Sequence, residues 1–302
     1  MVRRFGRSAA AFVLIYGLCL IWASVGPTTL GNNDPIAQGD QAYNQRFSIP
    51  ADQPMEFLRA YRPHMERAIG YYETAIRDPG SLSVQSQAHV YNRLAQLNYE
   101  LAKVLILEEA EEKVITDLLA EGKEYGFKSL QLHPGFDREK FLDTLTWVRD
   151  AAALVWTADC WGTWLGYNPL EGVVNLSKVR KMYEQAIALD EWFWSGSGHI
   201  GLGALLATTP SMMGGDLEEA KEHFERALEI DPDYLPASVV YAESYGFTHS
   251  FGKRSGIRDR RLIEERLTFV ANAPVGEKRP LWNWEAKAEA ETLWRELDRF
   301  SH

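Results

Sequence analysis

Apolar residues recur with the period of an α-helix along most of this chain. In the segment 65–79, Ala68, Tyr72 and Ala75 fall on one helical face at the i, i+4, i+7 spacing. Alternating runs of β-branched residues bounded by turns, which would predict strands, do not occur. The pattern therefore predicts an all-α fold.

The same face recurs three more times, with a small or slim residue, a ring or glycine four later, and Ala or Ser seven later. The four sets are Ala68, Tyr72, Ala75; Gly122, Gly126, Ser129; Val179, Tyr183, Ala186; and Ala220, Phe224, Ala227. Small residues let a second helix approach closely, and the ring fills the remaining space. The pattern resembles the second helix of a tetratricopeptide (TPR) repeat. The spacings between positions 75, 129, 186 and 227 are 54, 57 and 41 residues, so we expect an irregular TPR-like superhelix.

The helix before each repeat helix is expected to be its antiparallel partner, which gives about four to five helix pairs. The expected partner helices cover 85–106, 138–165 and 193–207, a last pair covers 235–249 and 258–272, and a C-terminal capping helix covers 281–300. Residues 55–302 thus form the predicted helical-repeat domain. Residues 27–54 are polar and rich in turn residues, which predicts a linker.

Residues 1–26 have the form of an export segment, with three arginines followed by an uncharged apolar run. A cleaved signal peptide and an uncleaved signal anchor both fit this segment. Because the basic residues precede the apolar run, the rest of the chain is expected to cross the membrane and to be periplasmic. Leu18 stands before Cys19, where lipid attachment needs a small residue, so a lipoprotein is disfavoured.

The formal net charge of −10 argues against binding to nucleic acid, because phosphates would be repelled. The seven histidines include no pair at helical ligand spacing with a carboxylate, so no metal and no cofactor is expected. Cys160 lies in an apolar helix and is expected to be an inert buried thiol. Because the sequence shows no titratable cluster, it predicts a protein that is not an enzyme.

Gly196, Gly198 and Gly201 have the G-x-G-x-x-G spacing of dinucleotide-binding loops. That function requires a strand before the glycines, and none is predicted here. We therefore expect these glycines to serve close helix packing. Asp216 and Glu219, three residues apart, predict a capping box at the start of the helix that follows.

Aromatic residues are dense between positions 147 and 199. The candidate ligand-binding residues are Trp156, Trp161, Trp164, Trp192, Trp194 and His199. Indoles carry an N–H group that needs a partner, so a cluster of them suits the wall of a cavity for a small, mostly apolar ligand. The alternative is that these rings are core.

Residues 188–228 combine the aromatic segment with a motif formed by Pro210, Gly214, Gly215 and Asp216, which leads into the repeat helix with Ala220, Phe224 and Ala227. Together with Trp156 and the segment 281–293, this motif resembles the T component of tripartite ATP-independent periplasmic (TRAP) transporters, the TatT family.

The resemblance implies a periplasmic, non-enzymatic protein that partners the solute-binding protein of a TRAP transporter. It also implies a homotrimer with openings or a pore for a small hydrophobic ligand. Members are commonly lipoproteins, from which this sequence departs at Leu18. The alternative function is a general TPR-like scaffold for protein assembly in the cell envelope, without a ligand cavity.

Overall fold

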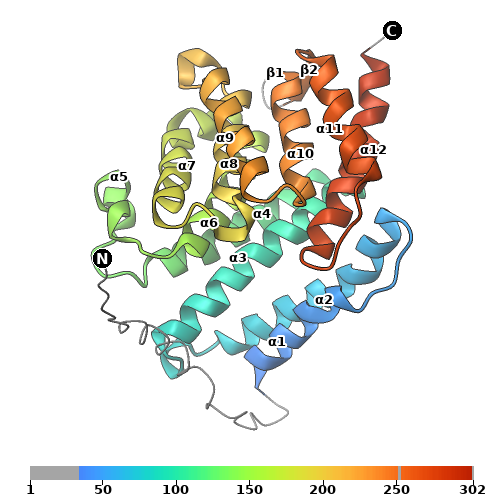
Figure 1. Cartoon of the computed structure of the whole chain (residues 1–302). Helices are drawn as coiled ribbons and strands as arrows, with labels where there is room; N and C mark the ends of the chain where they lie inside the picture. Colours follow the sequence, from blue (N-terminus) through green and yellow to red (C-terminus); the bar gives the residue numbers. More distant parts are fainter. Residues whose placement is uncertain (1–33, 251–252, 301–302) are drawn as a thin grey trace, which may run out of the picture. The chain divides into compact units, whose positions relative to one another are not determined.

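The computed structural model describes residues 34–250 and 253–300, which form twelve α-helices and one two-stranded sheet (Figure 1). The helices are α1 (Pro35–Asn44), α2 (Pro54–Ala75), α3 (Val84–Leu107), α4 (Glu112–Leu130), α5 (Phe141–Thr144), α6 (Ala151–Tyr167), α7 (Pro169–Leu189), α8 (Ser197–Thr208), α9 (Leu217–Ile230), α10 (Leu235–Tyr241), α11 (Arg260–Asn272) and α12 (Pro280–Arg299). The strands are β1 (Phe247–Ser250) and β2 (Lys253–Ile257). The predicted all-α helical-repeat fold is confirmed.

None of the helices in the described ranges is long and apolar enough to cross a membrane. The predicted export segment, 1–26, lies outside the described residues.

Consecutive helices pack as the repeated face predicts, α3 on α4, α6 on α7 and α8 on α9. Of the twelve residues that define the face, all are buried except Ala75, which is half-buried against the core. The small residues explain the close approach, because a Cβ at Gly126 would lie 2.1 Å from the Thr157 hydroxyl of the neighbouring helix.

The segment 27–54, predicted to be a linker, contains a helix in its described part. Residues 35–44 form α1, which packs on α2 and buries Tyr43. Polar contacts fix this pairing, since the Tyr72 hydroxyl donates to Asp40 at 2.6 Å and the Tyr61 hydroxyl donates to the Tyr43 carbonyl at 2.7 Å. The sequence of this segment is mostly polar because α1 buries only a narrow apolar face. Residues 27–33 lie outside the described residues.

The helix expected over 138–165 is interrupted. The chain forms short helical turns up to Trp147, passes Val148 in an extended conformation, and begins α6 at Ala151. Asp150 causes the restart, because its carboxylate accepts hydrogen bonds from the N–H groups of Ala152 and Ala153 at 2.9 and 3.2 Å.

The helix expected over 235–249 ends early. A π-helical turn over Ala242–Gly246 follows α10, and the chain then forms the β1–β2 hairpin, in which Phe247 pairs with Ile257. The Gly246 carbonyl accepts from the N–H groups of Arg258 and Asp259, at 2.8 and 2.9 Å, instead of continuing the helix. These bonds need the hairpin to return to Gly246, a non-local contact that helical periodicity does not encode.

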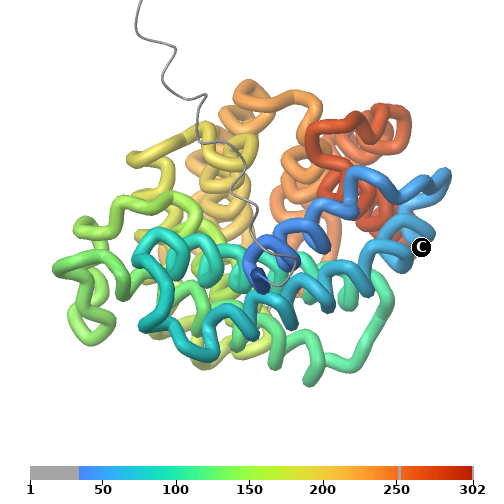
Figure 2. Tube along the Cα trace, turned by 90° about the horizontal axis from the view of Figure 1, so that it is seen from below, coloured from blue at the N-terminus to red at the C-terminus, as the bar shows by residue number. Residues whose placement is uncertain are grey.

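The last helix, α12, lies against α2, α3, α10 and α11, so it returns to the first long helices of the described chain (Figures 1 and 2). Asn283 fixes its start: the side-chain amide donates to the carbonyls of Val275 and Asp233, and its oxygen accepts from the Leu235 N–H at 3.1 Å. The predicted capping helix is therefore present and closes the core over α3.

The G-x-G-x-x-G glycines serve helix packing, as predicted. The segment directly before them, Phe193–Ser195, is a 3-10 helical turn and not a strand, and Gly196 has φ +78°, a left-handed conformation that starts α8. A Cβ at Gly201 would lie 2.4 Å from the Tyr183 ring on α7. The glycines thus let α8 approach α7 in a way that a larger residue would prevent.

We expect Gly201→Ala to destabilise the protein by about 1–3 kcal/mol, because the new methyl group overlaps the buried Tyr183 ring. Gly70→Ala in α2 is the matched control, since no atom lies within 4 Å of its Cβ position, and it should stabilise by up to about 1 kcal/mol. Urea unfolding measures both. Equal effects of the two substitutions would contradict the packing role of Gly201.

Candidate functional site

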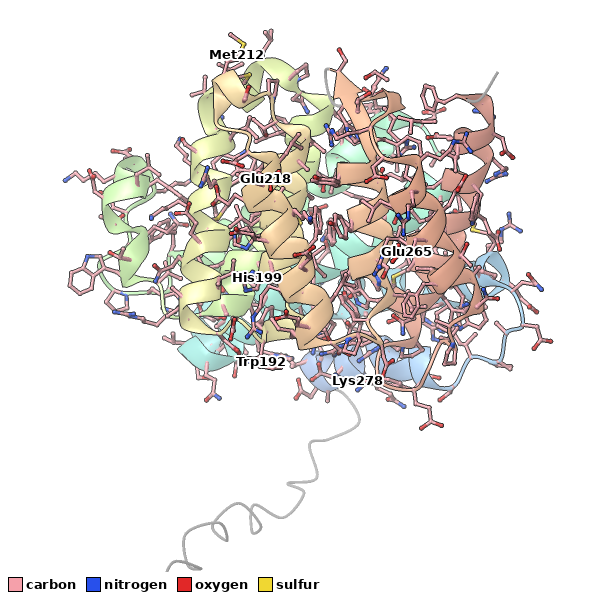
Figure 3. All side chains as sticks on the ribbon, turned by 45° about the horizontal axis from the view of Figure 1, so that its top comes forward. Trp192, His199, Met212, Glu218, Glu265 and Lys278 are labelled. Atoms are coloured by element: carbon pink, nitrogen blue, oxygen red, sulfur yellow. The ribbon has the colours of Figure 1, made fainter. Side chains whose placement is uncertain are left out.

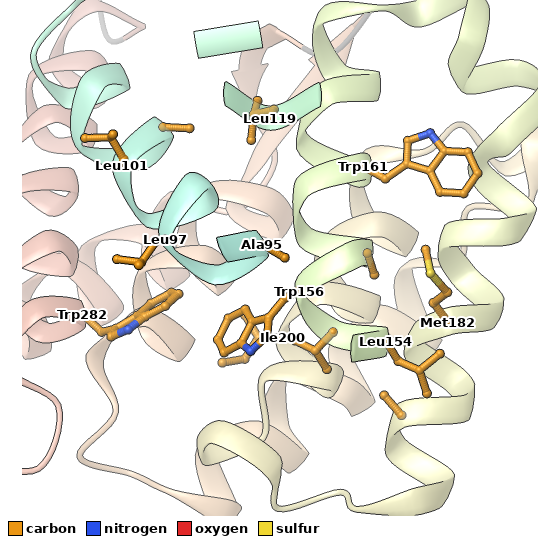
Figure 4. Packing of buried hydrophobic residues seen from close by; sticks show 14 of the residues in the cluster. Ala95, Leu97, Leu101, Leu119, Leu154, Trp156, Trp161, Met182, Ile200 and Trp282 are labelled. Carbon is orange, nitrogen blue, oxygen red and sulfur yellow. The ribbon is translucent and has the colours of Figure 1, made fainter. Parts of the chain in front are cut away.

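Two of the predicted ligand-binding rings meet in the core. The Trp156 ring lies 5.3 Å from that of Trp194 and 5.9 Å from that of Trp282 on α12, measured between centroids. Figure 4 shows Trp156 and Trp282 facing each other between α6 and α12. Trp156 is buried, while Trp194 is half-buried with its indole N–H lacking a hydrogen-bond partner.

The other three predicted tryptophans lie elsewhere. The Trp161 side chain lies on the side of α6 opposite to Trp156 (Figure 4). Its ring packs on that of Phe127, with 5.3 Å between the ring centroids. Trp164 stacks under the Lys123 ammonium, and Trp192 is 58% exposed beside Arg226. The six predicted residues therefore do not form one cluster.

His199 is buried on α8 and pairs with His223 of α9, with 2.8 Å between the two Nδ1 atoms. Figure 3 labels His199 on the side of the molecule that also carries Trp192. Burial, with the neighbouring His223, lowers the pKa of His199 to about 4, so the ring is neutral near pH 7.

A cavity of about 300 Å³ lies between α3, α6, α7, α8, α10 and α12. Its apolar wall consists of Val179, Ile200, Ala204, Leu205, Val240 and Trp282, and its polar wall includes Tyr99, Lys103, Asp159, Glu243, His249, Glu285 and Glu289. None of the six predicted ligand-binding residues lines it. Their proposed role in ligand binding stays a prediction without support from this cavity.

Lys103 of α3 stands between two carboxylates of α12. Its ammonium nitrogen lies 3.1 Å from Glu289 Oε2 and 3.6 Å from Glu285 Oε1. Burial disfavours the ammonium, but Glu289 and Glu285 outweigh this effect and raise the pKa of Lys103. Burial also raises the pKa of Glu285 to about 8 and that of Glu289, because one lysine does not compensate for two buried carboxylates.

Two further titratable groups, Asp159 and His249, line the cavity without forming an ion pair. Asp159 of α6 accepts a hydrogen bond from the Tyr183 hydroxyl at 2.7 Å, and burial raises the pKa of Asp159 to about 7. His249 of β1 has its pKa lowered to about 4 by burial and by Arg254 and Arg258. Buried polar atoms that lack any partner here are His249 Nδ1 and Glu285 Oε2.

A larger groove of about 1050 Å³ adjoins this cavity and shares Lys103, Glu243, His249 and Glu289 with it. Arg254 of β2 lies in the groove and pairs with Glu243 and Glu296. The β1–β2 hairpin that helical periodicity missed therefore supplies part of the wall.

The prediction that no titratable cluster exists is corrected by this arrangement. The titratable cluster consists of Lys103, Glu285 and Glu289, with Asp159 nearby on the same cavity wall. These side chains suit the binding of a polar group of a ligand. Cys160 lies behind it: its thiol donates to the Ala95 carbonyl at 3.3 Å, and burial raises the pKa of this thiol well above its usual value. In residues 34–250 and 253–300, no group of three His, Cys, Asp or Glu side chains is placed to hold a metal ion.

Comparison with known protein families matches residues 85–300 to the TRAP transporter T-component, TAtT. The chain belongs to the TRAP transporter T-component family. The matched region contains every cavity-lining residue, from Tyr99 to Glu289. A search of the curated proteins found no match.

The T-component motif is a turn between α8 and α9. A Cβ at Gly215 would lie 1.8 Å from the Thr209 carbonyl oxygen, and Gly214 has φ +95°, so both positions require glycine. Asp216 caps α9 by accepting from the N–H groups of Glu218 and Glu219. The reciprocal half of the predicted capping box is absent, because the Asp216 N–H donates to the Leu206 carbonyl.

Sequence reasoning missed the polar wall although signals for it exist. Asp159 is the one charged residue in the apolar helix α6, and Glu100 and Lys103 stand among the leucines, the alanine, the valine and the isoleucine of the second half of α3. A charge inside an apolar helix predicts a buried polar contact. Which residues of α12 complete it depends on the tertiary fold.

We expect Lys103→Met to destabilise the T-component by about 3–5 kcal/mol at pH 8, because Glu285 and Glu289 then lack a cation. Lys113→Met, which removes the exposed pair with Asp117, should change stability by less than about 0.5 kcal/mol. Urea unfolding measures both variants.

The loss in Lys103→Met should shrink at pH 5. The folded chain keeps a proton on Glu285 up to about pH 8, whereas an unfolded glutamate releases it near 4.5, so this group's contribution to stability falls as pH rises between those values. At pH 5 the carboxyl group is neutral and needs no cation. A loss that is constant between pH 5 and pH 8 would contradict this account.

Proposed function

We propose that this T-component is a periplasmic accessory protein of a TRAP-type transport system, which binds the solute-binding protein and admits a small ligand to the cavity between α3, α8 and α12. The observation that carries the proposal is the cavity itself, which lies wholly within the family-matched region. A concave, mostly apolar surface with a few converging polar groups is the usual form of a small-molecule site. It favours this function over a scaffold without a cavity.

A partner surface is proposed at one end of the helix pairs. The start of α7 exposes Leu170, Val173 and Val174, and the turn after α8 exposes Met212, which is 92% exposed. Arg180 of α7 donates to the carbonyl of Gly214 in that turn at 3.3 Å, which ties the two segments together. Figures 1 and 3 place the turn, with Met212, at the outer end of α8 and α9. Exposed apolar residues such as those at the start of α7 and in this turn favour a protein interaction surface.

The remaining parts of the proposal rest on the family and on the N-terminal sequence. Residues 1–26 would direct the chain across the membrane and be cleaved or remain as an anchor, which would hold the protein near the transporter. As in the family resemblance, the protein would be a homotrimer. The chain would act by binding, without catalysis.

The full exported chain, immobilised, should capture the TRAP solute-binding protein of the same organism. Leu170→Glu should weaken this capture at least about tenfold, because it places a charge in the proposed contact. Val84→Glu is the matched control, since Val84 is an exposed apolar residue at the start of α3, far along the chain from α7, and it should leave capture unchanged. Surface plasmon resonance measures both.

Light scattering on the same samples tests the trimer and the assignment of the surface. A trimer mass for both variants, with capture lost only in Leu170→Glu, is the expected result. A monomer mass for Leu170→Glu alone would assign the surface to self-association instead. Failure of the unmodified chain to capture any TRAP solute-binding protein would contradict the proposed partner.

A further inference from the structure

We propose that the cavity binds a small organic amine, with its protonated nitrogen at Glu285 and Asp159 and its apolar body against Ile200, Val240 and Trp282. This inference rests on the proposed function, which requires a ligand in the cavity, and it names the chemical class of that ligand.

The charges of the cavity select a cation. Four carboxyl groups, those of Asp159, Glu243, Glu285 and Glu289, line it together with one cationic side chain, Lys103. Lys103 is engaged by Glu285 and Glu289. Arg254 lies in the adjoining groove and pairs with Glu243 and Glu296. With Arg254 and Glu296 included, five carboxyl groups and two cationic side chains stand around this contact. An ammonium group would supply the charge that this wall lacks.

A buried oxygen of Glu285 without a hydrogen-bond partner is the proposed position for the nitrogen of the amine. Glu285 is 4% exposed, and its Oε1 faces Lys103 while its Oε2 has no hydrogen-bond partner. A buried carboxyl oxygen without a hydrogen-bond partner is costly, because it has lost water without gaining a partner. An ammonium group beside Glu285 would favour the ionised carboxylate over the protonated form that Glu285 otherwise keeps up to about pH 8. Glu285 lines the cavity, so a donor bound there would satisfy it.

The aromatic rings of the cavity favour the same ligand. Trp282 lies 6.1 Å from Tyr99 and 6.3 Å from Tyr234, between ring centroids, and all three line the cavity. Such rings pack against an apolar or aromatic ligand body, and their faces also attract an ammonium group bound nearby. Aliphatic side chains of α8 and α10 complete the wall with surface for an apolar body.

A ligand with a carboxylate is disfavoured by the same groups. Its charge would face four carboxyl groups, and the one lysine on the wall already donates to Glu289 at 3.1 and 3.3 Å. His249 does not supply a positive charge near pH 7, because burial and two arginines lower its pKa to about 4.

The test compares three probes that share a phenyl ring and differ in the polar end: 2-phenylethylamine, 2-phenylethanol and 3-phenylpropanoate. Isothermal titration of the full chain should show the amine binding at least about tenfold more tightly than the alcohol, and no binding of the carboxylate. Equal binding of all three, tighter binding of the carboxylate, or no binding of the amine would each overturn the proposal.

Variants of the cavity place the amine. Glu285→Gln should weaken binding of 2-phenylethylamine at least about tenfold and leave the alcohol unchanged, since the shape of the side chain is kept. Asp159→Asn is a second variant with the same expectation. Glu218→Gln, at an exposed position on α9, is the matched control and should bind the amine as the unmodified chain does. Unchanged amine binding by both folded cavity variants would overturn the proposal.

Capture of the solute-binding protein by the same Glu285→Gln variant separates the two proposals. Capture uses the surface at Leu170 and Met212, which contains no cavity residue. For the variant, weakened amine binding with intact capture is the expected result; failure of the unmodified chain to bind the amine, with its capture intact, overturns the amine proposal alone. Amine binding without capture supports the amine proposal and contradicts the proposed partner.

Discussion

The contact between α3 and α12 is the one on which the rest of the structure depends. One carboxylate oxygen of Glu100 on α3 accepts hydrogen bonds from Tyr43 of α1 at 3.1 Å, from Gln96 at 2.7 Å and from Trp282 of α12 at 3.1 Å. One turn further, Lys103 binds the α12 carboxylates Glu285 and Glu289. A buried charge is tolerated only where such partners surround it, so α1 and α12 must dock in one arrangement on α3.

This contact gives the cavity its character. The repeated small-and-aromatic face of the other helix pairs produces tight apolar packing, as Gly201 against Tyr183 shows. At the α3–α12 contact the chain instead places charged groups, and the space left between them and α8 is the cavity. The repeat helices α7 and α8 therefore supply most of the apolar wall, and α3, α6 and α12 together supply the lysine and most of the carboxyl groups of the polar wall.

The fold could be predicted from the sequence to a large extent because helical periodicity is local. The repeat faces, the pairs α3–α4, α6–α7 and α8–α9, and the closing helix all follow from spacing that lies within one or two helices. Local spacing did not predict α1, because its sequence is mostly polar although Tyr43 is buried. It also did not predict the hairpin, because the hydrogen bonds from Arg258 and Asp259 to Gly246 are non-local. The site was harder to predict, because tryptophans signal burial, and a buried ring serves equally in a core or a cavity wall. The polar wall joins Lys103 to residues about 180 positions away, and no local pattern encodes that contact.

The central claim is that the α3–α12 contact, and not the space between Trp156 and Trp194, forms the ligand site. A crystal structure of the chain grown with 2-phenylethylamine tests it most directly. The account predicts the amine nitrogen within about 3 Å of Glu285 Oε2, with the phenyl ring against Trp282. Density for the ligand between Trp156 and Trp194, with none beside Glu285, would contradict it.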